Sequence, residues 1–128
     1  MTFGYVDGEP LVRLEMAKGN GEWQEFFAYV DSGASYSVFY SDHARVLGID
    51  LKSGRKMNLM VGSGEKITVF VHKVRVKFSG GEFLAEIAFS DDLKIGMNLI
   101  GQHSFFENFT FCFKTWRRVL EVTPKENL

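Results

Sequence analysis

The sequence predicts an all-β fold, a small barrel or sandwich interrupted by one or two short helices. Apolar and polar residues alternate along most of the chain, which is the pattern of half-buried strands. The 13 glycines against 2 prolines indicate many tight turns. These turns separate short apolar runs at even spacing, as in small barrels and sandwiches. With 128 residues, the chain has the length of a single domain.

The first clear strand pair flanks a glycine turn. Val12, Leu14 and Met16 alternate with charged residues. The following Lys18-Gly19-Asn20-Gly21 contains residues that tolerate positive φ, so we expect a turn there. A second strand is predicted from Trp23 to Val30.

The later strands show the same alternation. Between Ile67 and Phe78 the pattern changes phase at His72-Lys73, which predicts a bulge or bend. Gly80-Gly81 predicts a hairpin turn, after which every second residue from 83 to 89 is apolar. Two final strands are expected, at residues 109–113 and 119–122.

Two short helices are predicted between the strands. Ser41 is a candidate N-cap for the first helix, and Gly48 is its expected C-terminal stop. The second covers one or two turns within Gln102–Asn108, with Phe105 and Phe106 toward the core. The polar end, Pro124–Leu128, is expected to fray.

Charge and composition argue against several classes of protein. The 15 basic and 16 acidic residues provide no electrostatic footprint for nucleic acid or an anionic membrane. The longest apolar run, Phe26–Val30, is far shorter than the roughly 20 residues of a membrane-spanning helix. Met1–Pro10 lacks the pattern of a secretory signal, and Cys112 is the only cysteine, which together fit a cytoplasmic location.

The most informative stretch is an apolar strand that ends in Asp31-Ser32-Gly33-Ala34. A carboxylate at the tip of a buried strand is costly unless it is hydrogen-bonded or paired. The glycine lets the backbone turn and leaves room for another chain to approach. Taken alone, an Asp-Ser-Gly run is most simply an ordinary turn.

In its context, this stretch resembles the active-site strand of the retropepsin-like aspartic proteases, where an apolar pair precedes Asp-Thr/Ser-Gly-Ala. Three further segments are similar to that family and stand in the same order. These are Val38–Asp50, which ends in a short helix and Leu47-Gly48-Ile49; Val61–Lys66, similar to the tip of a flap hairpin; and Asn98-Leu99-Ile100-Gly101-Gln102. The resemblance spans about residues 25–122. It implies a closed barrel of the retropepsin-like acid protease type, formed by one domain over residues 1–128.

The resemblance implies an aspartic endopeptidase that uses no cofactor or metal. Asp31 would be catalytic, with Ser32, Gly33 and Ala34 in the active-site loop. Gly62, Ser63 and Gly64 would bind substrate at the flap. Hydrolysis by water needs both a base and an acid, which two carboxylates sharing one proton supply. Because the chain contains one Asp-Ser-Gly run, we expect a homodimer that acts on a peptide or protein substrate.

Two residues depart from the viral members of that family. Ser35 stands where those enzymes carry a second acid, and Gln102 stands where they carry an arginine that pairs with it. The absence of this acid–arginine pair leaves open a second function: a non-catalytic, protease-like module for dimerisation or peptide binding. A protease restricted to one partner protein is a third reading.

Other candidate sites are weaker. Val6-Asp7-Gly8 lacks the hydroxyl and the apolar strand, and Asp91-Asp92 reads as a solvated loop. Gly62–Lys66 lacks the order of a phosphate-binding loop. The three histidines (His43, His72 and His103) are too far apart in sequence to form a metal-binding motif.

Overall fold

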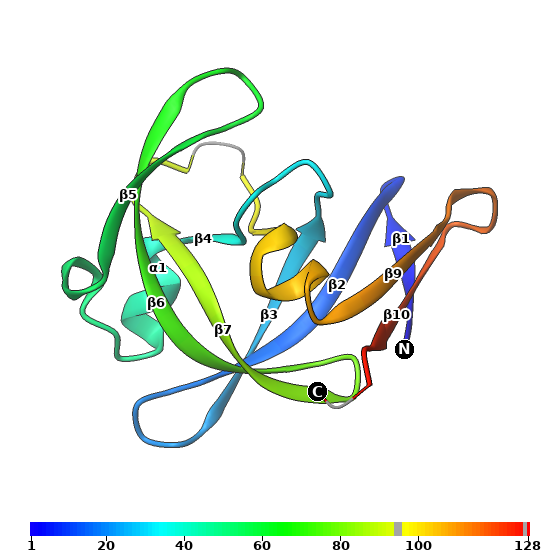
Figure 1. Ribbon diagram of the computed structural model, residues 1–128, viewed down its shortest axis with the longest axis horizontal. Coiled ribbons are helices and arrows are strands. Elements are labelled where there is room, and N and C mark those ends of the chain that lie inside the picture. The colour runs from blue at the N-terminus through cyan, green and yellow to red at the C-terminus, as the bar shows by residue number, and fades with distance from the viewer. Residues whose placement is uncertain (94–95, 127) are drawn as a thin grey trace.

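The computed structural model describes residues 1–93, 96–126 and 128 (Figure 1). Within them, strands predominate and the helices are short. The elements are β1 (Thr2–Val6), β2 (Glu9–Ala17), β3 (Trp23–Val30), β4 (Val38–Tyr40), α1 (Ser41–Val46), η1 (Leu51–Ser53), β5 (Arg55–Met60), β6 (Lys66–Phe78), β7 (Gly81–Ser90), β8 (Leu99–Ile100), η2 (Gln102–Phe106), β9 (Phe109–Lys114), η3 (Thr115–Arg117) and β10 (Val119–Pro124).

Part of the sheet closes into a ring. Neighbouring strands are hydrogen-bonded in the order β6-β7-β4-β8-β3-β2, and β2 pairs again with β6. The closing contact places Met16 opposite Val76. Strand β5 lies outside this ring beside β6, and β1, β10 and β9 extend the sheet beyond β2. The prediction of an all-β fold with a closed arrangement of strands is confirmed.

The first predicted hairpin is formed by β2 and β3. Their antiparallel pairing runs from Leu11 opposite Tyr29 to Ala17 opposite Trp23. Gly21 has a φ of 89° and donates its N–H to the carbonyl of Lys18 at 3.0 Å, as the turn residues predict. Alternate residues of both strands enter the core, as the period-two pattern predicts. This alternation continues to the end of β3 at Val30, where the loop of residue 31 begins.

Strand β6 changes the face that it buries without a bulge. Its register with β7 is unbroken over residues 70–78, so no extra residue is inserted at His72-Lys73. On its other edge, the partner changes from β5 to β2. Ile67, Val69 and Val71 enter one core cluster, whereas Val74, Val76 and Phe78 enter another. Of the predicted bulge or bend, the bulge is therefore wrong. The phase change marks the point at which β6 leaves one core cluster and enters the other.

Aromatic residues fill the larger of the two core clusters. Phe105 from η2 is fully buried, and its ring centroid lies 5.5 Å from that of Phe78. Phe78 also packs edge-on against Phe109 at 4.9 Å. Phe106 is only half-buried and stacks on Phe111, with 4.1 Å between ring centroids. Of the two phenylalanines predicted to face the core from this helix, Phe105 does so fully and Phe106 in part.

Helix α1 begins at Ser41, but not by the predicted cap. The N-cap position is Tyr40, and no side chain caps the helix. The Ser41 hydroxyl instead donates to the carboxylate of Asp91, which ties α1 to the loop after β7. The N-cap prediction is wrong because this hydroxyl has a partner 50 residues away. Gly48, with a φ of 77°, ends the helix as expected.

The second hairpin turn and the C-terminal segment also differ in detail from expectation. Ser79 and Gly80 occupy the left-handed turn positions, and Gly81 already pairs with Phe78 as the first residue of β7. Pro124 still belongs to β10, and the N–H of Lys125 donates to the carbonyl of Asn108 at 2.9 Å. The prediction that the chain frays from Pro124 is therefore wrong for Pro124 and Lys125. Asn127, which also falls in that tail, lies outside the described residues.

No helix among the described residues has both the length and the apolar character needed to cross a bilayer.

Candidate active site

Asp31 stands at the end of β3, where the chain leaves the ring. Its side chain is exposed, and its backbone N–H donates to the carbonyl of Ile100 at 2.9 Å. The N–H of Gly33 donates to Asp31 Oδ1 at 2.9 Å, which orients the carboxylate. The N–H of Ala34 donates to the Asp31 carbonyl at 3.1 Å and closes the turn. The loop thus presents an oriented carboxylate to solvent.

Strand β8 supports this loop from below. It lies between β3 and β4, parallel to β3 with Val30 opposite Ile100 and antiparallel to β4. Gly101 follows it and donates its N–H to the buried hydroxyl oxygen of Ser37 at 2.9 Å. A Cβ at Gly101 would lie only 2.6 Å from the carbonyl oxygen of Ala34. Glycine is therefore required for β8 to pass this close beneath the loop.

The two residues after Gly101 also bind the loop. The backbone N–H groups of Gln102 and His103 donate to the carbonyls of Ala34 and Ser35 at 2.8 and 2.9 Å. The side-chain Nε2 of Gln102 donates to the carbonyl of Ser32 at 2.6 Å. Gln102, which departs from the viral pattern, thus holds the loop within its own chain, and Ser35 is left exposed.

A pocket of about 420 Å³ lies between this loop and the β5–β6 hairpin. Such a volume is within the usual range for small-ligand and peptide side-chain sites. Figure 1 shows the hairpin (green) projecting on the side of the ring where the loop (cyan) lies. The pocket is lined by Asp31, Gly33, Ala34, Ser35, Tyr36, Val38, Leu59, Met60, Val61, Gly62, Ser63 and Leu99. Of these described residues, only Asp31 carries a carboxylate.

The tip of the hairpin lies where the glycine-rich segment predicts it. The N–H of Val61 donates to the carbonyl of Glu65 at 2.9 Å, and the N–H of Gly64 donates to the carbonyl of Val61 at 2.9 Å. Gly64 has a φ of 85°, which shapes the turn. Gly62 and Ser63 line the pocket, whereas Gly64 and Ser32 are not among its lining residues. The remaining predicted site residues share the pocket with Asp31.

Several apolar lining residues are not identifiable as site residues from the sequence. Met60, from the end of β5, is 68% exposed and lines the pocket beside half-buried Leu59. Tyr36, Val38 and Leu99 complete the apolar wall. Position in or next to the recognised segments is the one signal that could have found them: Tyr36 directly follows Ser35, and Leu99 lies within the segment Asn98–Gln102.

A second pocket, of about 340 Å³, lies between β2 and the β6–β7 turn, and Asp31 is not part of it.

The other candidate residues have local structural roles. Asp7 and Gly8 form the β1–β2 turn with φ values of 50° and 77°. Asp92 accepts the N–H of Thr68 at 3.2 Å. Across the described residues, no three His, Cys, Asp or Glu side chains gather as metal ligands would.

His43 of α1 contacts Asn98, the residue directly before β8. Asn98 donates one Nδ2 hydrogen to the carbonyl of Phe27 at 3.0 Å, and its Nδ2 lies 3.2 Å from His43 Nε2. Because an amide nitrogen only donates, the imidazole must accept at Nε2 and is neutral. Burial lowers the pKa of His43 below its ordinary value, against a smaller opposite effect of Asp42.

Acidification is therefore expected to destabilise the fold through His43. Its folded pKa lies below that of the unfolded chain, so the unfolded chain takes up the proton first as the pH falls. The stabilisation is complete above the ordinary value of 6.5 and is lost between that value and the lowered folded one. The urea midpoint should fall over this window, and His43→Gln, which keeps an acceptor for Asn98, should flatten the decline. An equal decline in both proteins would contradict this role.

Comparison with known proteins bears on the fold. No protein-family model and no curated protein sequence matches the chain. Among solved structures, the chain is similar to a retropepsin-like aspartic protease from Rickettsia conorii, with a TM-score of 0.70 and 20% identity over 96% of this chain and 97% of that one. It is also similar to the EIAV protease complexed with the inhibitor HBY-793, with a TM-score of 0.57 and 20% identity over 76% of this chain and 85% of that one. The closed ring of strands is therefore the retropepsin-like aspartic protease fold.

Proposed function

We propose that the chain is a homodimeric aspartic endopeptidase in which Asp31 from each of two copies forms the catalytic dyad. The observation that carries this proposal is the Asp31 carboxylate, oriented by the Gly33 N–H and facing a pocket beneath a glycine-bearing hairpin. The fold supports it, because the Rickettsia conorii structure is named a retropepsin-like aspartic protease and the EIAV structure a protease bound to an inhibitor.

The reaction needs two carboxylates in different protonation states. One takes a proton from the attacking water, and the other gives a proton to the carbonyl oxygen of the scissile peptide. Two adjacent carboxylates do not both ionise, so one proton is shared between them. Their titrations are then coupled and belong to the pair. The pocket of one chain supplies a single carboxylate from its described lining residues, and the second copy would supply the other.

A two-fold axis beside the loop would bring the two Asp31 side chains together. Ser32, exposed in the single chain, would then reach across the axis toward the partner's loop.

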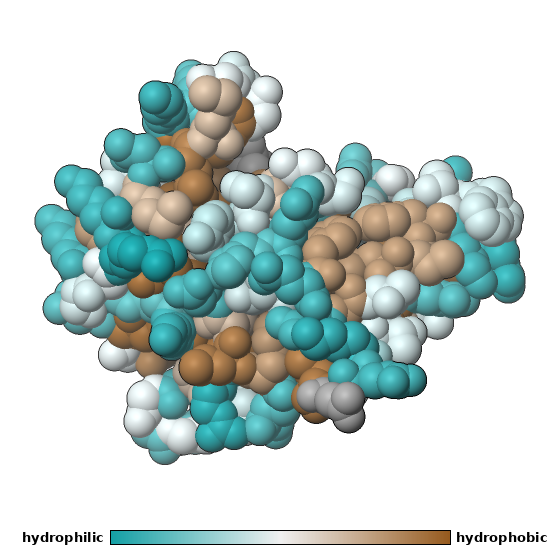
Figure 2. Space-filling model, viewed as in Figure 1, coloured by the Kyte–Doolittle hydropathy of each residue, from teal (hydrophilic) through white to brown (hydrophobic). Residues whose placement is uncertain are grey.

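Figure 2 shows an apolar patch over the region of β9. On this strand Phe111 is half-buried and Phe113 is 36% exposed. Apolar surface of this kind marks interaction sites, which supports an interface involving β9.

The β5–β6 hairpin would act as the flap. Its tip contributes Gly62 and Ser63 to the pocket, and a Cβ at Gly62 would meet no atom within 4 Å. The space beside this glycine is therefore open, and the proposal requires the tip to move relative to the loop. Closure over a bound peptide would place its backbone against the tip and exclude water from the reacting carbonyl.

One observation favours the non-catalytic alternative. The side chain of Gln102 holds the loop from within the chain, at 2.6 Å from the Ser32 carbonyl, without an acid–arginine pair. A protease-like module that binds peptides without cleaving them could be built this way. It would retain the apolar pocket but would have no need of a solvent-facing carboxylate at Asp31.

Incubation with an unfolded protein substrate between mildly acidic and neutral pH separates these functions. The enzyme is expected to cleave the substrate, and a statine-type inhibitor, which mimics the tetrahedral intermediate, is expected to block cleavage. Peptide binding without turnover at any pH in this window would favour the module. A protease restricted to one partner would cleave that partner alone and would remain sensitive to the inhibitor.

A further inference from the structure

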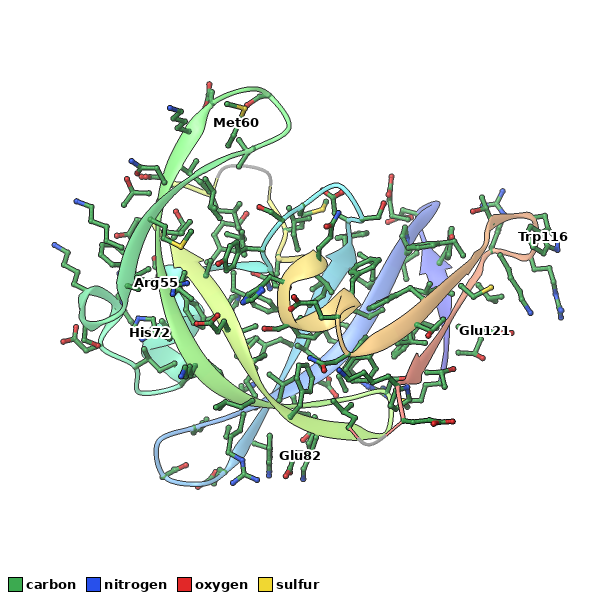
Figure 3. The ribbon with its side chains drawn as sticks, in the orientation of Figure 1. Arg55, Met60, His72, Glu82, Trp116 and Glu121 are labelled. Carbon is green, nitrogen blue, oxygen red and sulfur yellow. The ribbon has the colours of Figure 1, made fainter. Side chains whose placement is uncertain are left out.

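A cluster of polar side chains lies behind one wall of the pocket and involves none of the predicted site residues. It joins His103 of η2, Glu86 of β7, Arg55 of β5, Tyr36 after the active-site loop, and Glu107 after η2. Figure 3 labels Arg55 at the root of β5, with Met60 near the tip of the same hairpin. The cluster therefore spans the elements that form the two sides of the pocket.

His103 lies between two carboxylates. Its Nε2 is 2.7 Å from Glu86 Oε1, and its Nδ1 is 3.1 Å from Glu107 Oε1. Ionised carboxylates only accept hydrogen bonds, and a neutral imidazole has a single N–H. A neutral His103 would therefore direct a lone pair at one of the two carboxylates. The arrangement is satisfied by the imidazolium, which donates from both nitrogens.

His103 also contacts the active-site loop in two ways. Its backbone N–H donates to the Ser35 carbonyl at 2.9 Å. Its ring centroid lies 4.8 Å from that of Tyr36, with the two planes tilted by 51°. Since Tyr36 lines the pocket, the imidazole supports a residue that would face the substrate.

Arg55 extends the cluster to the hairpin. Its Nη2 is 3.4 Å from the Tyr36 hydroxyl and 3.8 Å from Glu86 Oε2. Arg55 is the first residue of β5, the strand that leads to the hairpin tip at residues 61–65. A displacement of Tyr36 or Glu86 would therefore change the contacts of Arg55 at the start of the hairpin.

We propose that Glu86 and His103 are positioning residues, which hold Tyr36 as one wall of the pocket and link that wall to the root of the β5–β6 hairpin. The effect on peptide cleavage rests on the proposed function; the link itself does not. Substrate positioning would then depend on a charged pair that lies outside the active-site loop. Loss of this pair should weaken substrate binding more than it slows the chemical step.

The charges around this pair come from four elements. Glu86 on β7 faces His103 of η2, Arg55 of β5 and Lys73 of β6, and Glu107 faces His103 from the other side. The hydrogen bond from His103 holds the pKa of Glu86 below its usual value, and the positive charges of Arg55, His103 and Lys73 add to this effect.

Glu86→Gln tests the proposal, with Glu82→Gln as its matched control. Glu82 also lies on β7 and pairs with an arginine, Arg75, at 2.7 Å, but it is outside the cluster. We expect Glu86→Gln to raise KM for a peptide substrate about threefold to tenfold while kcat stays within about twofold. Glu82→Gln should leave both constants unchanged. Arg55→Gln, at an exposed side chain, should raise KM in the same direction.

A second readout needs no catalysis. In the full chain, Glu86→Gln should shift the NMR ring signals of both His103 and Tyr36, which it contacts directly and through His103, respectively, whereas Glu82→Gln should leave both sets of signals unchanged. Equal KM values for the Glu86 and Glu82 variants, or Tyr36 ring signals that Glu86→Gln leaves unchanged, would overturn the proposal. If the unaltered chain cleaves nothing, the proposed function fails, and the NMR comparison alone decides whether the link exists.

Discussion

Asp31→Asn is expected to abolish peptide hydrolysis and leave the fold intact. An amide can neither take a proton from water nor donate one as a carboxylic acid does, so both roles of the dyad are lost. We expect kcat/KM to fall by at least about 10³-fold, measured with a fluorogenic peptide that the unaltered chain cleaves. The amide oxygen can still accept the Gly33 N–H, now made to Asp31 Oδ1 at 2.9 Å, so the unfolding midpoint should not change.

Asp7→Asn provides the matched control for this result. Asp7 occupies a left-handed position in the β1–β2 turn, a conformation that asparagine adopts well. Its substitution should leave both activity and stability unchanged. Full peptidase activity in Asp31→Asn would contradict the proposed mechanism.

Gly101→Ala is expected to be the most damaging single substitution near the site. Its Cβ would lie 2.5 Å from the Tyr36 carbonyl oxygen and 2.6 Å from that of Ala34. Both atoms belong to backbone, so relief requires β8 and the active-site loop to move apart. We expect a loss of about 3 kcal/mol in the free energy of unfolding, measured in urea, together with loss of activity.

Gly62→Ala controls for the general cost of replacing glycine. A Cβ there meets no atom within 4 Å, and Gly62 is not among the glycines with positive φ. Its effect on the free energy of unfolding should stay within about 0.5 kcal/mol. If the two variants unfold at the same urea concentration, β8 does not pass as closely beneath the loop as the structure places it.

Local sequence patterns predict much of this fold because they report local physics. The alternation in β2 and β3 follows directly from which residues face the core, and the turn at residues 18–21 follows from residues that adopt positive φ. Taken alone, the run Asp31–Ala34 reads as an ordinary turn, and it is recognisable because three further segments that resemble the same family follow it in order.

The errors arise where a distant partner decides the outcome. Ser41 does not cap its own helix because its hydroxyl reaches Asp91, and β6 needs no bulge because its partner changes from β5 to β2. The cluster of His103 and Glu86 is invisible in the sequence for the same reason. Its members come from separate elements, and folding alone brings them together.

Mixing the unaltered chain with Asp31→Asn chains tests most directly whether the active site is shared between two copies. If each active site needs one Asp31 from each copy, subunit exchange converts active dimers into inactive mixed ones. Activity per unaltered chain should then fall to about one-tenth in an about ninefold excess of the variant. Activity that stays proportional to the amount of unaltered chain, after exchange has been verified, would contradict a dyad built from two copies of Asp31.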